Sequence, residues 1–220
     1  MRSFSLISLF LFITAASFGQ GTYRIQGQLD SLGGTPKVYL RKQDNNSSRV
    51  LSIATTSAAN GRFTLSHNAS EIDFYTVYVD GVPGQVSFIL DKDVTITGVG
   101  KDLRQAEVTG SPLTDEWKRF QNEVERPYRD QLMTLYNERQ QSGGSKAVAD
   151  RVASEEKRLK QEQIAKVSDY IRQHADSPLS LFFLSNYWNE MPKAEAQALY
   201  KGLAAPLKNH SVAKRMAKFM

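Results

Sequence analysis

Val108-Thr109-Gly110-Ser111-Pro112-Leu113 is the stretch at which the hydrophobic period of the chain changes. Before it, apolar and polar residues alternate, which is the period of half-buried strands. After it, apolar residues recur every three or four positions, which indicates amphipathic helices. Ser111 is placed to cap a helix whose first turn holds Pro112, where a missing N–H costs nothing. The sequence therefore predicts an α+β protein, with a β-rich domain at residues 20–110 and an α-helical region at residues 111–220.

The β-rich domain is expected to hold about seven short strands, separated by turn residues. In its first strand, Tyr23 and Ile25 alternate with polar residues. Asn60-Gly61 supplies the positive φ of a tight turn, so we predict that residues 50–56 and 62–66 pair as a hairpin. Strands at this spacing favour an antiparallel β-sandwich or a sharply curved sheet.

The helical region is expected to begin with a long hairpin and to continue with short helices. Gly143-Gly144 interrupts the apolar stripe, so the helices before and after it should fold back on each other. Pro127 should kink the first of them. Shorter helices are expected after Ser177-Pro178, after Met191-Pro192 and at residues 211–220.

The first residues have the layout of a secretory signal peptide. Arg2 is followed by an apolar run of 13 residues, 4–16, and small residues occupy positions 17 and 19. Such a run is shorter than the roughly 18 residues that span a bilayer. We predict cleavage of residues 1–19, export to the periplasm or cell envelope, and no integral membrane segment after cleavage. A lipoprotein is excluded because lipid attachment needs a cysteine and the chain has none.

Composition and spacing argue against several classes of chemistry. Without cysteine, this chain has no thiol or disulfide for redox catalysis. The net charge is +5, but basic residues are interspersed with acidic ones, as in Glu155-Glu156-Lys157-Arg158, so nucleic acid is not expected as a partner. His67, His174 and His210 stand in no metal-binding spacing, and Asp91 and Asp93 lack a further oxygen donor. We therefore predict no catalytic residue, no metal site and no cofactor.

The order of short motifs along the chain resembles a known accessory domain. It is similar to the N-terminal domain of unknown function that precedes a thioredoxin-like domain in envelope thiol:disulfide interchange proteins of bacteroidete bacteria. The helical part, with Asp176-Ser177-Pro178-Leu179-Ser180 and Ala205-Pro206-Leu207-Lys208, is similar to the segment that joins the two domains. The paired-cysteine domain of that family is absent from these 220 residues. The motifs that carry the resemblance are Tyr23-Arg24-Ile25-Gln26-Gly27, Lys37-Val38-Tyr39-Leu40, Asn60-Gly61-Arg62-Phe63-Thr64-Leu65, Phe88-Ile89-Leu90-Asp91 with Val94-Thr95-Ile96, and Val108-Thr109-Gly110-Ser111.

Exposed aromatic and basic side chains are the candidates for partner binding. Tyr39 and Arg41 lie on one strand and Tyr78 on another, and such residue types suit the recognition of a peptide or an acidic protein. Phe219 extends the apolar stripe of the last helix, which we expect to dock against protein. The aromatic residues of the other helices, including Trp188, are expected in the core.

Two functions follow from this reading. The first is an exported, non-catalytic accessory module that binds a protein partner, such as a second copy of the chain or a thioredoxin-like domain that it holds in position. The alternative is a free-standing ligand- or peptide-binding β-sandwich. That alternative requires a pocket with converging polar groups between the sheet and the helices.

Overall fold

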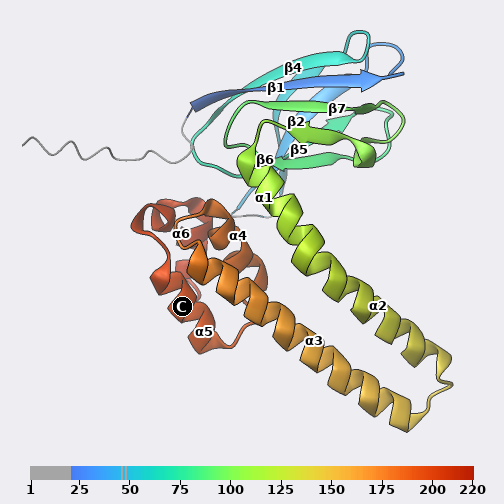
Figure 1. Cartoon of the computed structure of the whole chain (residues 1–220). Helices are drawn as coiled ribbons and strands as arrows, with labels where there is room; N and C mark the ends of the chain where they lie inside the picture. Colours follow the sequence, from blue (N-terminus) through green and yellow to red (C-terminus); the bar gives the residue numbers. More distant parts are fainter. Residues whose placement is uncertain (1–20, 46, 48) are drawn as a thin grey trace, which may run out of the picture.

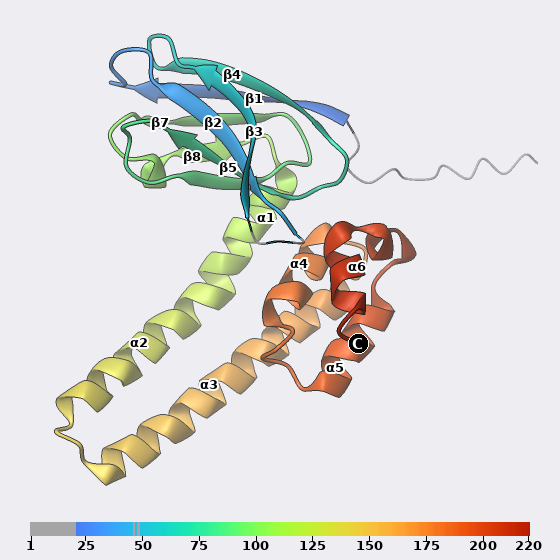
Figure 2. The ribbon, with the colours of Figure 1, turned by 180° about the vertical axis from the view of Figure 1, so that it is seen from behind.

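The computed structural model describes residues 21–45, 47 and 49–220 (Figure 1). The expected signal peptide, residues 1–19, lies outside the described residues. A β-sandwich is followed by a helical part, in which a long helical hairpin extends away from the sandwich (Figures 1 and 2). The predicted α+β fold is confirmed.

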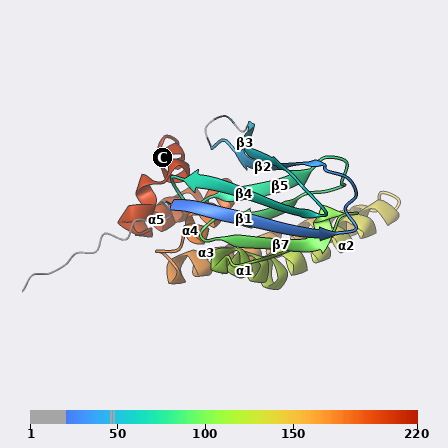
Figure 3. The same ribbon diagram turned by 90° about the horizontal axis from the view of Figure 1, so that it is seen from above.

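The sandwich consists of two four-stranded sheets, which lie as two layers in Figure 3. Within the described residues there are eight strands, because Glu107–Thr109 adds one to the seven that were predicted. Neighbouring strands pair antiparallel, except that β1(Gly21–Asp30) and β7(Val94–Val99) run parallel. The first sheet has the order β4(Arg62–Ala69), β1(Gly21–Asp30), β7(Val94–Val99), β8(Glu107–Thr109), and the second has the order β3(Val50–Ser57), β2(Lys37–Gln43), β5(Phe74–Val79), β6(Val86–Ile89).

The predicted hairpin between residues 50–56 and 62–66 is wrong. Asn60 and Gly61 do have positive φ angles of 51° and 74°, and they close a tight turn. However, β3 pairs with β2 and β4 pairs with β1, so the chain passes from one sheet to the other at this turn. The carbonyl of Gly61 accepts a hydrogen bond of 2.8 Å from the N–H of Leu29, which fixes the turn to β1. The tight turn at Asn60-Gly61 was predicted correctly, but β4 pairs with β1 rather than with β3.

Alternating residues of both sheets fill the space between the two layers. The side chains on the inner faces are almost fully buried, as the alternation along each strand requires. Burial of each large aliphatic or aromatic side chain contributes about 1.5–3 kcal/mol before the entropy of folding is counted. The largest of these residues are Ile25, Leu29, Leu40, Tyr75, Phe88, Leu90 and Ile96.

The helices begin where the sequence predicted. Ser111 accepts a hydrogen bond of 2.9 Å from the N–H of Thr114 and so caps the first helix, α1(Pro112–Phe120). Pro127 lies in the first turn of α2, directly after a π-helical turn, which accommodates its missing N–H without ending the helix. α2 and α3 form the predicted antiparallel hairpin (Figure 1). The helical elements are α1(Pro112–Phe120), the π turn Gln121–Glu125, α2(Arg126–Gln141), α3(Lys146–Gln173), α4(Pro178–Tyr187), α5(Lys193–Gly202), the 3-10 turn Ala205–Asn209 and α6(Ser211–Ala217).

The second core lies around α4, in which eight of the ten residues are buried. Helices α1, α3, α5 and α6 surround it and contribute the remaining apolar side chains. Residues of the sandwich also join this core. Ile72, before β5, and Ile89 of β6 are buried in it. The ring of Phe74 lies 5.0 Å from the rings of both Trp117 and Phe182. Phe74 is on the outer face of β5, so one end of that sheet face is covered by helices.

Candidate functional site

Three of the four predicted partner-binding residues lie together on the outer face of the second sheet. Tyr39 of β2 is directly opposite Tyr78 of β5, and their ring centroids are 6.0 Å apart. The guanidinium carbon of Arg41 lies 4.4 Å from the ring centroid of Tyr78 and 5.2 Å from that of Tyr39. We call these three residues the Tyr–Arg–Tyr cluster. It occupies the part of the sheet face that the helices leave uncovered.

Hydrogen bonding and charge hold this cluster in one arrangement. The hydroxyl of Tyr39 donates a hydrogen bond of 3.0 Å to a carboxylate oxygen of Asp80. That hydrogen bond raises the pKa of Tyr39, so the hydroxyl stays protonated. Among the described residues, Arg41 pairs with no carboxylate, and its contacts are the two tyrosine rings. Its positive charge is therefore available to an incoming acidic group.

Phe219, the fourth predicted residue, lies on a different surface. Its side chain is 70% exposed, whereas Val212 and Met216 of the same stripe are buried against the other helices. α6 ends at Ala217, so Phe219 lies beyond the helix and does not continue its buried face. The helix itself docks on its own bundle through Val212 and Met216, and Phe219 takes no part in that contact.

A groove of about 510 Å³ lies beside Phe219, and we call it the C-terminal groove. Trp188, which we had expected in the core, is only half-buried and lines this groove together with Phe219. Lys193 and Arg215 add positive charge to the lining. The other lining residues are Ser185, Asn189, Met191 and Met216.

A network of charged and polar groups joins the sandwich to α6, and we call it the junction cluster. The ammonium group of Lys42 lies 2.7 Å from a carboxylate oxygen of Asp73 and 3.6 Å from one of Glu71. Glu71 accepts hydrogen bonds from the N–H and the hydroxyl of Ser211, at 3.0 and 2.5 Å. His210 Nε2 donates to the carbonyl of Ile72 at 2.7 Å, and its Nδ1 accepts from an α6 amide at 3.1 Å. These contacts fix the start of α6 against the loop between β4 and β5.

The junction cluster contains residue types that bind metals, but its ligand atoms are already in use. Glu71, Asp73 and His210 have possible ligand atoms within 4.8 Å of one another. The ammonium group of Lys42 forms ion pairs with both carboxylates, and both ring nitrogens of His210 are hydrogen-bonded. A cation would have to displace the Lys42 ammonium group, so the geometry favours a structural junction. Sequence spacing gave no sign of it, since Glu71 and His210 are 139 positions apart.

The junction cluster should make the stability of the protein depend on pH in the acidic range. Burial alone would raise the pKa of Glu71, but the hydrogen bonds from Ser211 and the charge of Lys42 lower it below 4.5. A carboxyl whose pKa is lowered by folding stabilises the fold above its unfolded pKa and loses that effect as the pH falls through its folded pKa. We expect Glu71→Gln to lower the melting temperature at neutral pH, and the difference from wild type to shrink below about pH 4.5. Thermal unfolding across this pH range, with the exposed Glu123→Gln as control, measures the effect, and a difference that is the same at every pH would contradict it.

A pocket of about 280 Å³ opens between the edges of β3 and β4, next to the junction cluster. Its polar groups include His67, whose Nε2 lies 3.1 Å from the hydroxyl of Tyr75. Burial, and then the charge of Lys42, lowers the pKa of His67, which favours the neutral ring. Ser211 of α6 completes the lining. We call this pocket the seam pocket. It lies between the edges of the two sheets, and Ser211 is the lining residue that a helix supplies, so it differs from the pocket between sheet and helices that the alternative function requires.

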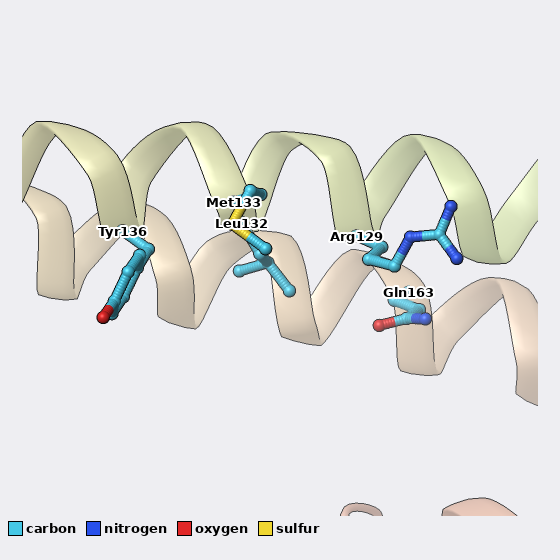
Figure 4. Close-up of a pocket in the computed structure, with 5 residues that line it drawn as sticks. All are labelled: Arg129, Leu132, Met133, Tyr136 and Gln163. Carbon is cyan, nitrogen blue, oxygen red and sulfur yellow. The ribbon is translucent and has the colours of Figure 1, made fainter.

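The helical hairpin carries an apolar groove of about 390 Å³ (Figure 4). Leu132, Met133 and Tyr136 lie along α2, and Gln163 is contributed by α3. Met133 and Tyr136 are 56% and 54% exposed. Neither residue was among the predicted site residues, because both lie beside the apolar stripe of α2 that packs against α3.

Comparison with known proteins finds a family model that matches the sandwich. Residues 23–117 match the family described as a domain of unknown function (DUF4369), so the match spans the sandwich and ends within α1. Comparisons with curated proteins and with solved structures gave no match. The expected domain of unknown function is thus confirmed, whereas the link to thiol:disulfide interchange proteins stays a prediction.

In the part of the chain that the structure describes, no helix is long and apolar enough to cross a bilayer.

Proposed function

We propose that this protein is an exported, non-catalytic accessory module of the cell envelope that binds a protein partner and holds a thioredoxin-like domain in position. The observation that carries the proposal is the Tyr–Arg–Tyr cluster, three half-buried side chains that hold one another in place on the outer face of the second sheet. The absence of cysteine from these 220 residues supports it, since they supply no thiol for interchange chemistry.

The cluster has the properties of an interface centre. Tyrosine and arginine are the residue types that most often dominate binding energy at protein interfaces. The contact of Tyr39 with Asp80 and of Arg41 with both rings limits the rotamer freedom that binding would otherwise remove. The unpaired charge of Arg41 selects for a carboxylate on the partner. A partner surface with an acidic residue beside an apolar patch therefore fits this site.

Calorimetric titration of residues 20–220 with a separately expressed thioredoxin-like domain tests the proposal. We expect measurable binding that Arg41→Ala weakens by about tenfold or more, because a truncated interface centre costs more than about 1 kcal/mol. The matched control is Arg24→Ala, which removes an exposed arginine from the other sheet. Binding that is absent, or that both variants weaken equally, would contradict the proposal. So would reduction of insulin by the purified chain alone.

The seam pocket supports the second candidate function, a ligand- or peptide-binding sandwich. In that case small polar ligands or short peptides should raise the melting temperature of the chain. His67→Ala should remove the shift, because the imidazole lines the pocket. A screen in which no compound shifts the melting temperature would argue against this function.

A further inference from the structure

Positive charge is concentrated at the C-terminal end of the chain. Residues 193–220 contain six Lys and Arg and a single acidic residue, a net charge of +5 that equals the net charge of the whole chain. The rest of the sequence is therefore balanced. This basic segment forms α5 and α6, and it supplies Lys193, Arg215 and Phe219 to the C-terminal groove.

The positive charge beside the groove is not neutralised within the described residues. Arg215 donates hydrogen bonds of 2.6 Å to the carbonyl of Asn45 and 3.2 Å to the hydroxyl of Ser185, both of which are uncharged. These bonds hold the guanidinium in place and leave its charge unpaired. Lys193, at the start of α5, is exposed and forms no ion pair in the described part of the chain. An incoming carboxylate would meet two cations that no acidic residue already occupies.

The apolar part of the groove offers room for a large side chain. Trp188 and Phe219 are its aromatic lining, and Met191 and Met216 are buried side chains beside them. The groove volume of about 510 Å³ exceeds what one aromatic side chain needs. Because Phe219 is 70% exposed, an occupant that covers it would bury apolar surface that is now in water.

We propose that the C-terminal groove binds an acidic segment of a partner protein, which inserts a large apolar side chain beside Trp188 and Phe219. Charge complementarity identifies the occupant, since both charged residues that line the groove, Lys193 and Arg215, are basic. The same charge argues against a second copy of this surface, which would bring two basic segments together. The proposal is independent of the Tyr–Arg–Tyr cluster and of a thioredoxin-like partner.

A membrane surface fits the groove less well than a protein segment. A helix that binds a bilayer needs its apolar face free, but α6 buries Val212 and Met216 against its own bundle. Phe219 and the neighbouring Met220 are the large apolar side chains that this end of the chain leaves exposed. The groove is also concave, which suits a protruding side chain rather than a flat lipid surface.

Fluorescence anisotropy with a labelled peptide tests the proposal on residues 20–220. The probe is a short peptide with glutamates on both sides of a Leu-Phe pair, and its analogues carry lysines in place of the glutamates or Gly-Ser in place of Leu-Phe. We expect the first peptide to bind, both analogues to bind at least about tenfold more weakly, and added salt to weaken the binding. Equal binding of the lysine analogue or of the Gly-Ser analogue would overturn the proposal.

Two variants locate the binding site. Phe219→Ser and Lys193→Glu should each weaken binding of the acidic peptide by about tenfold, without changing the circular dichroism spectrum, because both side chains are exposed. Their controls are Met133→Ser, at another exposed apolar residue, and Lys146→Glu, at another exposed lysine, both on the hairpin. Variants that bind as tightly as wild type would overturn the proposal. Binding to anionic phosphatidylglycerol vesicles that depends on Phe219 and exceeds peptide binding would replace it with a membrane site.

Discussion

Gly110→Ala is expected to destabilise the protein by about 3 kcal/mol or more. Gly110 has a φ of 95°, a conformation that residues with a Cβ rarely adopt. A Cβ at this position would lie 2.4 Å from the backbone oxygen of Asp93, which cannot move without displacing β7. The residue stands between β8 and the capped start of α1, so the strain falls on the connection between the two parts of the fold.

Urea unfolding of the two proteins measures this effect through the transition midpoint. The control is Gly33→Ala, where an added Cβ meets no atom within 4 Å. The control should change stability by no more than about 1 kcal/mol. A Gly110→Ala protein that unfolds at the same urea concentration as the control would show that the connection tolerates a side chain, against the structure.

Phe183→Ala is the second large effect, at about 3–5 kcal/mol. Phe183 is 1% exposed at the centre of α4, where its ring stacks on Phe120 at 4.2 Å and meets the edge of Tyr170 at 5.1 Å. Removing the ring leaves a cavity that the surrounding helices cannot fill without losing contacts of their own. Thermal unfolding should therefore begin at a much lower temperature.

The matched control is Phe219→Ala, the same change at a phenylalanine that is 70% exposed. It should change stability by no more than about 0.5 kcal/mol, because surface substitutions rarely cost more. If Phe219→Ala destabilised the protein as much as Phe183→Ala, Phe219 would belong to the core of the bundle. The description of the C-terminal groove would then be wrong.

The fold class was predictable because local signals agree with the tertiary structure at the boundary between the two parts. The change of hydrophobic period, the Ser111 cap and Pro112 in the first turn all indicate a helix that starts there, and it does. Strand partners were less predictable. Asn60-Gly61 specifies a turn, but the eight residue pairs between β1 and β4 decide which sheet receives β4. Local turn chemistry cannot report a pairing with a strand that lies 40 positions earlier.

The candidate site was predictable where strand alternation was enough. Alternation along β2 places Tyr39 and Arg41 on one face, but the position of Tyr78 beside them depends on the order of strands in the sheet. Phe219 was placed on the buried stripe of the last helix because its spacing from Met216 fits a helix. α6 ends at Ala217, before Phe219, so the helical spacing does not decide where the side chain of Phe219 lies. The junction cluster joins residues from three distant segments, and no local pattern in the sequence brings them together.

Hydrogen exchange of residues 20–220, with and without a saturating thioredoxin-like domain, tests the central claim most directly. The account predicts slower exchange in β2 and β5, on either side of Tyr39 and Tyr78, and unchanged exchange in the α2–α3 hairpin. No change in exchange anywhere, or slower exchange confined to the hairpin, would contradict a partner-binding role for the Tyr–Arg–Tyr cluster.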